Sequence, residues 1–187
     1  PGLTFTDRPG FLLSLRPPEH TLSNGRPMKT SGNPNPPPSS GAEARSGSLD
    51  ALLALAGRGL QQVRAGRSSA TALEHAAPGL RPGAQALLYH TLRHLGLAEA
   101  LRSRLAPRTP PPAVDALLCT TLALAAAPHG AGYEAFTLVN QAVQAAKRDA
   151  ATRPQAAFVN ACLRRFLRER ESLLAAVSQD PVARWNH

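Results

Sequence analysis

The stretch that decides the fold is residues 110–130, which read PPPAVDALLCTTLALAAAPHG. It begins with a proline triplet that can start a helix, and it ends with Pro128-His129-Gly130, which stops one. Between these signals apolar residues recur at the three- and four-residue spacing of a helix. They are Val114, Leu117, Leu118, Thr121, Leu122 and Ala125. So rich a pattern predicts a central, mostly buried helix.

The sequence around this stretch has the composition of an all-helical domain. From residue 49 onward alanine and leucine dominate, valine is sparse and isoleucine is absent, which favours helix over strand. We expect a bundle of about six to seven helices. Besides the central helix, they span about 49–63, 70–76, 82–105 with an interruption at Gly96, 133–148 and 154–177. The interrupted pair is expected to form a helical hairpin.

Local signals refine these helices. Ser48 or Asp50 can cap the first helix, and Gly66 is placed to end it. Two apolar stripes are expected to face the core. One consists of Phe136, Val139, Val143 and Ala146, and the other of Phe158, Val159, Cys162, Phe166 and Leu173.

Residues 1–48 differ sharply from the rest of the chain. They hold nine of the 18 prolines, and this density denies both helical hydrogen bonds and sheet ladders, so we expect a disordered segment rich in Pro, Gly and Ser. Residues 49–178 are the expected domain, and residues 179–187 the start of a linker. The charge follows the domain, because 49–187 carry 16 basic and 9 acidic residues, against five and three in 1–48. A polyanionic partner such as RNA is plausible, although solvated surface charge would give the same composition.

Two segments carry the most specific information: residues 137–147, TLVNQAVQAAK, and residues 158–165, FVNACLRR. Both resemble the paired signatures of the NusB-like fold. The resemblance continues through Arg168-Glu169-Arg170 to the ending 183–187, ARWNH, which resembles the junction into the catalytic half of the RsmB (Fmu/Sun) family of rRNA cytosine-C5 methyltransferases. It covers about residues 49–187. A departure is Ser48-Leu49-Asp50, where NusB proteins usually carry an arginine for RNA contact.

The resemblance implies an RNA-binding domain that positions small-subunit rRNA for a methyltransferase domain in the same polypeptide. That domain would use S-adenosylmethionine, so this chain alone is expected to hold no cofactor and to catalyse nothing. The parent reaction needs a nucleophilic cysteine and a glycine-containing loop beside a strand, and the sequence offers neither. Two alternatives use the same fold: an independent NusB-type antitermination factor, and a protein-binding helical scaffold.

The expected RNA-binding residues are basic. Arg164, Arg165 and Arg168 fall within roughly 100° of arc on the last helix, opposite its apolar stripe. Lys147, Arg148 and Arg153 surround the preceding loop, and Arg58, Arg64 and Arg67 could extend the patch. Asn140 and Asn160 are expected to bridge helices inside the bundle rather than read bases. Because most aromatic residues lie at core spacing, base stacking has no support from the sequence.

Other site types lack their residues. Cys119 and Cys162 lie in apolar helical patterns without zinc or disulfide spacing, so both are expected to be core residues in a reducing compartment. His90 and His94 are four residues apart, but no carboxylate partner stands at a compelling spacing, and no metal site is expected. No run is long and apolar enough for a membrane span, and no signal peptide is visible, so we expect a cytoplasmic protein.

Overall fold

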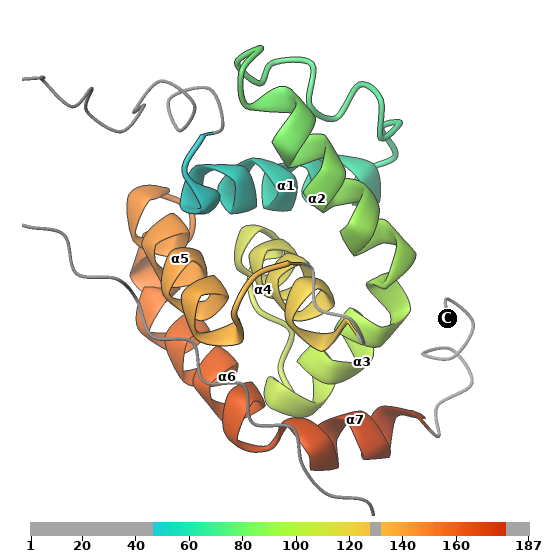
Figure 1. The fold of residues 1–187 in the computed structure, drawn as a ribbon, viewed down its shortest axis with the longest axis vertical. Helices are drawn as coiled ribbons and strands as arrows, with labels where there is room; N and C mark the ends of the chain where they lie inside the picture. The colour runs from blue at the N-terminus through green and yellow to red at the C-terminus, as the bar shows by residue number, and fades with distance from the viewer. Residues whose placement is uncertain (1–46, 128–131, 179–187) are drawn as a thin grey trace, which may run out of the picture. The chain divides into compact units, whose positions relative to one another are not determined.

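The computed structural model describes residues 47–127 and 132–178, all within the unit Pro37–His187. The predicted disordered segment, apart from Gly47 and Ser48, lies outside these residues, and so do the predicted linker 179–187 and Pro128-His129-Gly130. The all-α prediction is confirmed, because the described residues form helices and no strand (Figure 1). The elements are α1 (Leu49–Arg64), α2 (Arg81–Arg93), α3 (Leu95–Leu105), α4 (Pro112–Ala126), α5 (Ala135–Arg148), the 3-10 turn η1 (Arg153–Gln155), α6 (Ala156–Arg168) and α7 (Arg170–Ser178).

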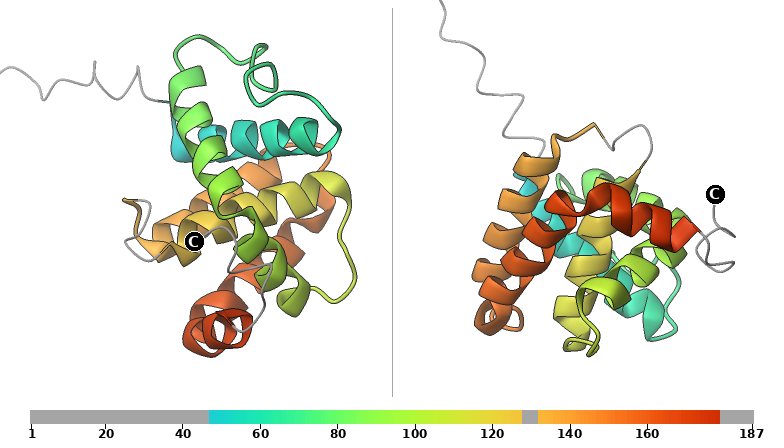
Figure 2. Two further views of the ribbon diagram at one scale, coloured as in Figure 1. Left: turned by 90° about the vertical axis from the view of Figure 1, so that its right-hand side faces the viewer. Right: turned by 90° about the horizontal axis from the view of Figure 1, so that it is seen from below.

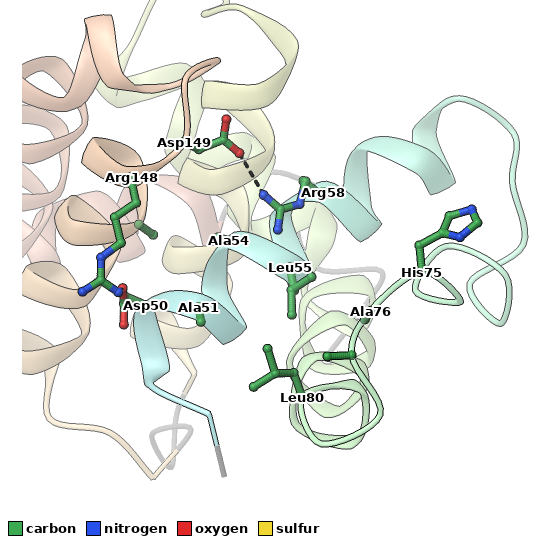
Figure 3. Close-up of a pocket in the computed structure, with 12 residues that line it drawn as sticks. Asp50, Ala51, Ala54, Leu55, Arg58, His75, Ala76, Leu80, Arg148 and Asp149 are labelled. Carbon is green, nitrogen blue, oxygen red and sulfur yellow. Dashed lines mark hydrogen bonds and ion pairs between the residues drawn. The ribbon is translucent and has the colours of Figure 1, made fainter. Parts of the chain in front are cut away.

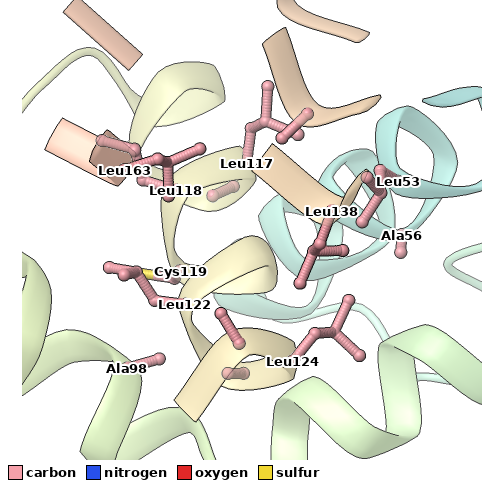
Figure 4. Close-up of a cluster of buried hydrophobic side chains, with 14 of the residues drawn as sticks. Leu53, Ala56, Ala98, Leu117, Leu118, Cys119, Leu122, Leu124, Leu138 and Leu163 are labelled. Atoms are coloured by element: carbon pink, nitrogen blue, oxygen red, sulfur yellow. The ribbon is translucent and has the colours of Figure 1, made fainter. Parts of the chain in front are cut away.

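The predicted central helix is α4. Every residue from Val114 to Ala126 is buried, and α1, α2, α3, α5 and α6 all contact it. Figure 4 shows leucines of the surrounding helices meeting Leu117, Leu118 and Leu122 of α4. Since full burial of one leucine side chain contributes roughly 1.5–3 kcal/mol, this cluster supplies much of the free energy that holds the bundle together.

Helix α1 begins and ends close to the predicted positions, but its start is not capped as expected. The Ser48 side chain makes no capping hydrogen bond, and the Asp50 carboxylate is buried in an ion pair with Arg148. At the other end Gly66 adopts a φ of 90°, and its N–H donates to the carbonyl of Val63. A left-handed conformation of this kind favours glycine, so the predicted helix stop is confirmed.

The predicted short helix at 70–76 is wrong, because this stretch is a series of turns. The Ser68 and Thr71 side chains bond to each other and to each other's backbone, with Thr71 N donating to Ser68 Oγ at 3.2 Å. Such local side-chain bonds compete with the helical ladder. Pro78 follows closely and lacks the N–H that a longer helix would need.

The predicted hairpin over 82–105 is also wrong. Helix α3 follows α2 after the single residue His94, and it leads on from the end of α2 rather than folding back along it (Figure 2, left). The break lies at His94, with φ −110° and ψ 21°, and Gly96 lies inside α3. This bend lets Leu88 of α2 and Leu101 of α3 both reach the core. Packing, and not the glycine, therefore sets the break.

The last predicted helix is divided in two at Glu169. There α6 ends and α7 turns to pack Leu173 and Val177 against the bundle. Arg170, which would lie near the apolar stripe of a straight helix, instead donates from Nη2 to the carbonyl oxygen of Ala125 at 3.3 Å. Ala125 belongs to the last turn of α4, where free carbonyls favour a cation.

Candidate nucleic-acid interface

Helices α5 and α6 carry the six predicted RNA-binding residues. They lie side by side and are joined only by residues 149–155, so the two helices run in opposite directions (Figures 1 and 2). The end of α5 therefore lies beside the start of α6, and the start of α5 beside the end of α6. This arrangement divides the predicted residues into two groups.

The first group, Lys147, Arg148 and Arg153, lies at the connection between the helices. Arg153 Nε donates to the carbonyl oxygen of Lys147 at 2.9 Å, which holds the two residues together at an exposed corner. Arg148 is engaged differently, because its Nη1 pairs with the Asp50 carboxylate at the start of α1. The Asp50 side chain is 4% exposed and that of Arg148 is 67% exposed. Arg148 thus neutralises a buried charge from a position on the surface.

The second group lies on the last two turns of α6. Arg164 and Arg168 are exposed, one helical turn apart, and neither has a carboxylate partner among the described residues. Arg164 Nε donates to Asn160 Oδ1 at 3.0 Å. Arg165 pairs with Glu169 at 2.9 Å and is less exposed. The predicted cationic face is therefore present, with Arg164 and Arg168 as its unneutralised charges.

The two groups are not one compact patch. Arg153 and Arg164 are 11 residues apart, which at about 1.5 Å per residue separates them by roughly 16 Å along η1 and α6. Both groups lie on the α5–α6 hairpin, and a ligand that met both would have to follow its length. An extended polyanion has the required shape, because its charges repeat along a strand.

Two predictions about polar side chains on this hairpin are wrong. Asn140 is exposed on α5, and Asn160 is partly exposed and bonds to Arg164 of its own helix. Neither bridges helices inside the bundle. Each asparagine follows a buried valine, Val139 or Val159. The next residue along a helix is turned by about 100°, which carries each asparagine away from the core.

The hairpin also exposes two aromatic rings that were predicted to face the core. Phe136 is 61% exposed and Phe158 37%, and Tyr133, just before α5, is 38% exposed. The buried side of α5 is formed by Leu138, Val139, Ala142, Ala145 and Ala146. At 100° per residue, Phe136 lies roughly 120° from the centre of this side. The three alanines mark the side of α5 that packs closely against its neighbours, and their positions in the sequence could have predicted that Phe136 is exposed.

A hollow of about 280 Å³ lies between α1, the turns before α2, and the end of α5 (Figure 3). Its floor is apolar, and its edge carries Arg58, His75 and Arg148. Both arginines are paired, Arg58 with Asp149 at 2.9 Å and Arg148 with Asp50. Because each cation already faces a carboxylate, the hollow has little net charge to attract a phosphate.

Arg64, predicted to extend the basic patch, instead belongs to an internal network. Its Nη1 donates to Asp115 Oδ2 at 2.8 Å and its Nη2 to Glu99 Oε1 at 2.7 Å. Arg102 Nε lies 2.8 Å from Asp115 Oδ1, but without hydrogen-bond geometry, so this contact is electrostatic. The network joins α1, α3 and α4 and is structural. No local signal in the sequence indicated it.

The two cysteines are buried, as predicted, and neither forms a disulfide. Burial raises the pKa of the Cys119 thiol to about 11, and the charge of Asp115 acts in the same direction. Burial also raises the pKa of Cys162. Since a thiol reacts as its thiolate, both are poor nucleophiles at neutral pH.

The His90 and His94 rings lie 4.6 Å apart between centroids. In the part of the chain that the structure describes, no group of three or more His, Cys, Asp or Glu side chains could hold a metal ion. No helix within 47–127 or 132–178 is both long and apolar enough to cross a membrane.

Comparison with known proteins gives one match. Residues 42–168, more than half of the 187-residue chain, match the model of the NusB family. No curated protein and no solved structure gives a significant match. The match covers α1 to α6, including both segments that resemble NusB signatures, and it ends at Arg168, where the chain bends into α7. The chain belongs to the NusB family.

Proposed function

We propose that this chain is the RNA-binding domain of an S-adenosylmethionine-dependent methyltransferase that modifies a cytosine of small-subunit rRNA. In this proposal residues 49–178 position the rRNA and catalyse nothing by themselves. A catalytic domain of the same polypeptide follows a linker that begins at residues 179–187. Membership of the NusB family indicates an RNA-binding or antitermination-type function, and the RNA-binding part of the proposal is a more specific form of it.

The observation that carries the RNA proposal is the pair of unneutralised guanidinium groups on α6. Arg164 and Arg168 lie one turn apart on a surface that faces solvent, while Arg64, Arg58 and Arg148 are all held by carboxylates. A free guanidinium can form two hydrogen bonds to one phosphate, which makes arginine well suited to RNA backbones. Lys147 and Arg153 extend this surface along the hairpin.

The methyltransferase part rests on the sequence of the C-terminal region alone. Residues 183–187, ARWNH, resemble the junction into the catalytic half of the RsmB family. The reading frame after His187 should encode a Rossmann-like domain with a proline-cysteine motif. A stop codon directly after His187 would contradict this part and favour a NusB-type antitermination factor.

The methyl donor is assigned to that further domain. A glycine-containing loop beside a strand would be needed to hold it, and the described residues form only helices and their connections, so they do not fit this cofactor. Titration calorimetry of this chain with S-adenosylmethionine should show no saturable heat. A micromolar isotherm would contradict the assignment.

The experiment that tests RNA binding is a salt titration with an rRNA fragment. If Arg164 and Arg168 contact phosphates, the double substitution to Gln should reduce the magnitude of the log-log slope by about two, roughly one for each lost contact. Arg165→Gln is the matched control on the same helix, because Arg165 already pairs with Glu169. We expect the control to keep most of the wild-type slope.

Folding must be checked beside affinity. The substituted arginines are exposed, so each change should alter stability by less than about 0.5 kcal/mol. An unchanged affinity and slope in a folded double variant would exclude this surface from RNA binding. Binding of a protein but of no structured RNA by the wild-type chain would support the scaffold alternative instead.

A further inference from the structure

Phe136 is the most exposed of the large apolar side chains that the structure describes, with 61% of its surface accessible. It lies on the first turn of α5 and contributes nothing to the buried side of that helix. A ring in this position is not needed for folding. Its exposure makes it a candidate contact for a ligand.

The described neighbours of Phe136 along the chain are mostly polar. Glu134, Thr137 and Asn140 are its exposed neighbours along α5, and Tyr133 adds one ring with a hydroxyl group. Protein-binding sites usually bury a cluster of apolar side chains inside a polar rim. Exposed rings among polar groups, here Phe136 and Tyr133, instead suit flat partners of their own size, such as nucleobases.

The end of α6 brings charge to the same place. Because α5 and α6 are antiparallel neighbours, the start of α5 and the end of α6 lie at one end of the hairpin (Figure 1). Phe136 is therefore at the same end as Arg164 and Arg168, neither of which has a carboxylate partner among the described residues. An aromatic ring and unneutralised guanidinium groups at one end of a hairpin together offer contacts for the base and the phosphates of a nucleotide.

We infer that Phe136 is a base-stacking residue and that this end of the hairpin takes an unpaired nucleotide of the RNA. The base lies on the face of the Phe136 ring, and the adjoining phosphates are placed toward Arg164 and Arg168. A paired base cannot use this site, because both of its faces are covered within the duplex. The inference rests on the proposed RNA-binding function and adds to it a residue that selects unpaired over paired strands.

The test compares Phe136→Ala with the wild-type chain on two probes: a mixed-sequence single-stranded RNA of about 10 nucleotides, and the same strand annealed to its complement. The affinity for the single strand should fall roughly 5- to 150-fold, which corresponds to the about 1–3 kcal/mol that stacking of one base contributes. The affinity for the duplex and the salt dependence of binding should not change, because no charge is removed. Phe136→Trp should restore single-strand binding.

Thr137→Ala is the matched control, since Thr137 is an exposed neighbour of Phe136 and should leave both affinities unchanged. A second readout places 2-aminopurine in the single strand, where stacking on Phe136 should quench its fluorescence in the wild-type complex and not in the Phe136→Ala complex. Wild-type affinity in Phe136→Ala, or an equal loss for single strand and duplex, would overturn the inference while leaving RNA binding intact. If the wild-type chain bound neither probe nor an rRNA fragment, the proposed function itself would fail.

Discussion

Arg64 and Asp115 join the end of α1 to the start of α4 through a hydrogen bond of 2.8 Å between Nη1 and Oδ2. The Asp115 side chain is only 8% exposed, and it also lies beside Arg102. One carboxylate thus neutralises two cations at the edge of the core. Through these contacts Arg64 and Arg102 are structural residues.

Asp115→Asn should destabilise the bundle strongly. The substitution removes the only charge that Arg102 contacts among the described ion pairs, and it leaves Arg64 with Glu99 alone. Breaking a buried pair costs about 3–5 kcal/mol, which urea denaturation would measure as a lower midpoint. Asp149→Asn is the control, because its pair with Arg58 is exposed and should contribute about 0–1 kcal/mol. Equal effects of the two substitutions would contradict the structural role of Asp115.

Arg148→Gln should cost more stability than Lys147→Gln. Arg148 is the partner of a carboxylate that is almost fully buried, and its loss leaves Asp50 unpaired, whereas Lys147 is exposed and has no carboxylate partner among the described residues. A buried charged group without its partner costs roughly 1–3 kcal/mol. Thermal melting of the two variants side by side would measure the difference. No difference between them would mean that Asp50 finds another partner.

The stability of the protein should fall in alkaline solution because of Cys119. The pKa of this thiol is about 11 in the folded chain, above its ordinary 9.0, so the unfolded chain loses the proton first as the pH rises. Below about pH 9 both states are protonated and the thiol has no effect on the pH dependence. Between about pH 9 and 11 the free energy of unfolding should fall by roughly 2–3 kcal/mol more for the wild-type chain than for Cys119→Ala. Urea denaturation at a series of pH values measures this difference, and the same pH dependence in both chains would contradict the raised pKa.

Position 57 should tolerate one methyl group and no more. A Cβ on Gly57 would lie 3.4 Å from the Cα of Leu117, an ordinary contact, so Gly57→Ala should be neutral or gain up to about 1 kcal/mol from helix propensity. Gly57→Leu would push α1 away from α4 and should cost about 1–3 kcal/mol or more. Chemical denaturation of the two variants measures whether each substitution raises or lowers the free energy of unfolding. A tolerated leucine would mean that α1 can shift on α4.

The sequence by itself determined the class of fold and the central helix. The three- and four-residue spacing of residues 114–125 is a local property and predicts a helix. Because this helix is apolar on almost every side, it must be buried, and it is α4. The same local rule placed Arg164, Arg165 and Arg168 on one face of α6 and put both cysteines inside. Short segments of α5 and α6 carried the resemblance to the NusB-like fold, and the match over residues 42–168 shows the family.

Only the tertiary structure decided which basic residues are available to a ligand. Arg148 and Asp50 are 98 residues apart in the chain, and Arg64 and Asp115 are 51 apart, so no local pattern pairs them. Packing also overrode local periodicity, because α5 buries its alanines against close neighbours and leaves Phe136 in solvent. Helical spacing fixes which side chains share a face, but the neighbouring helices decide whether that face is covered and whether its charges are neutralised.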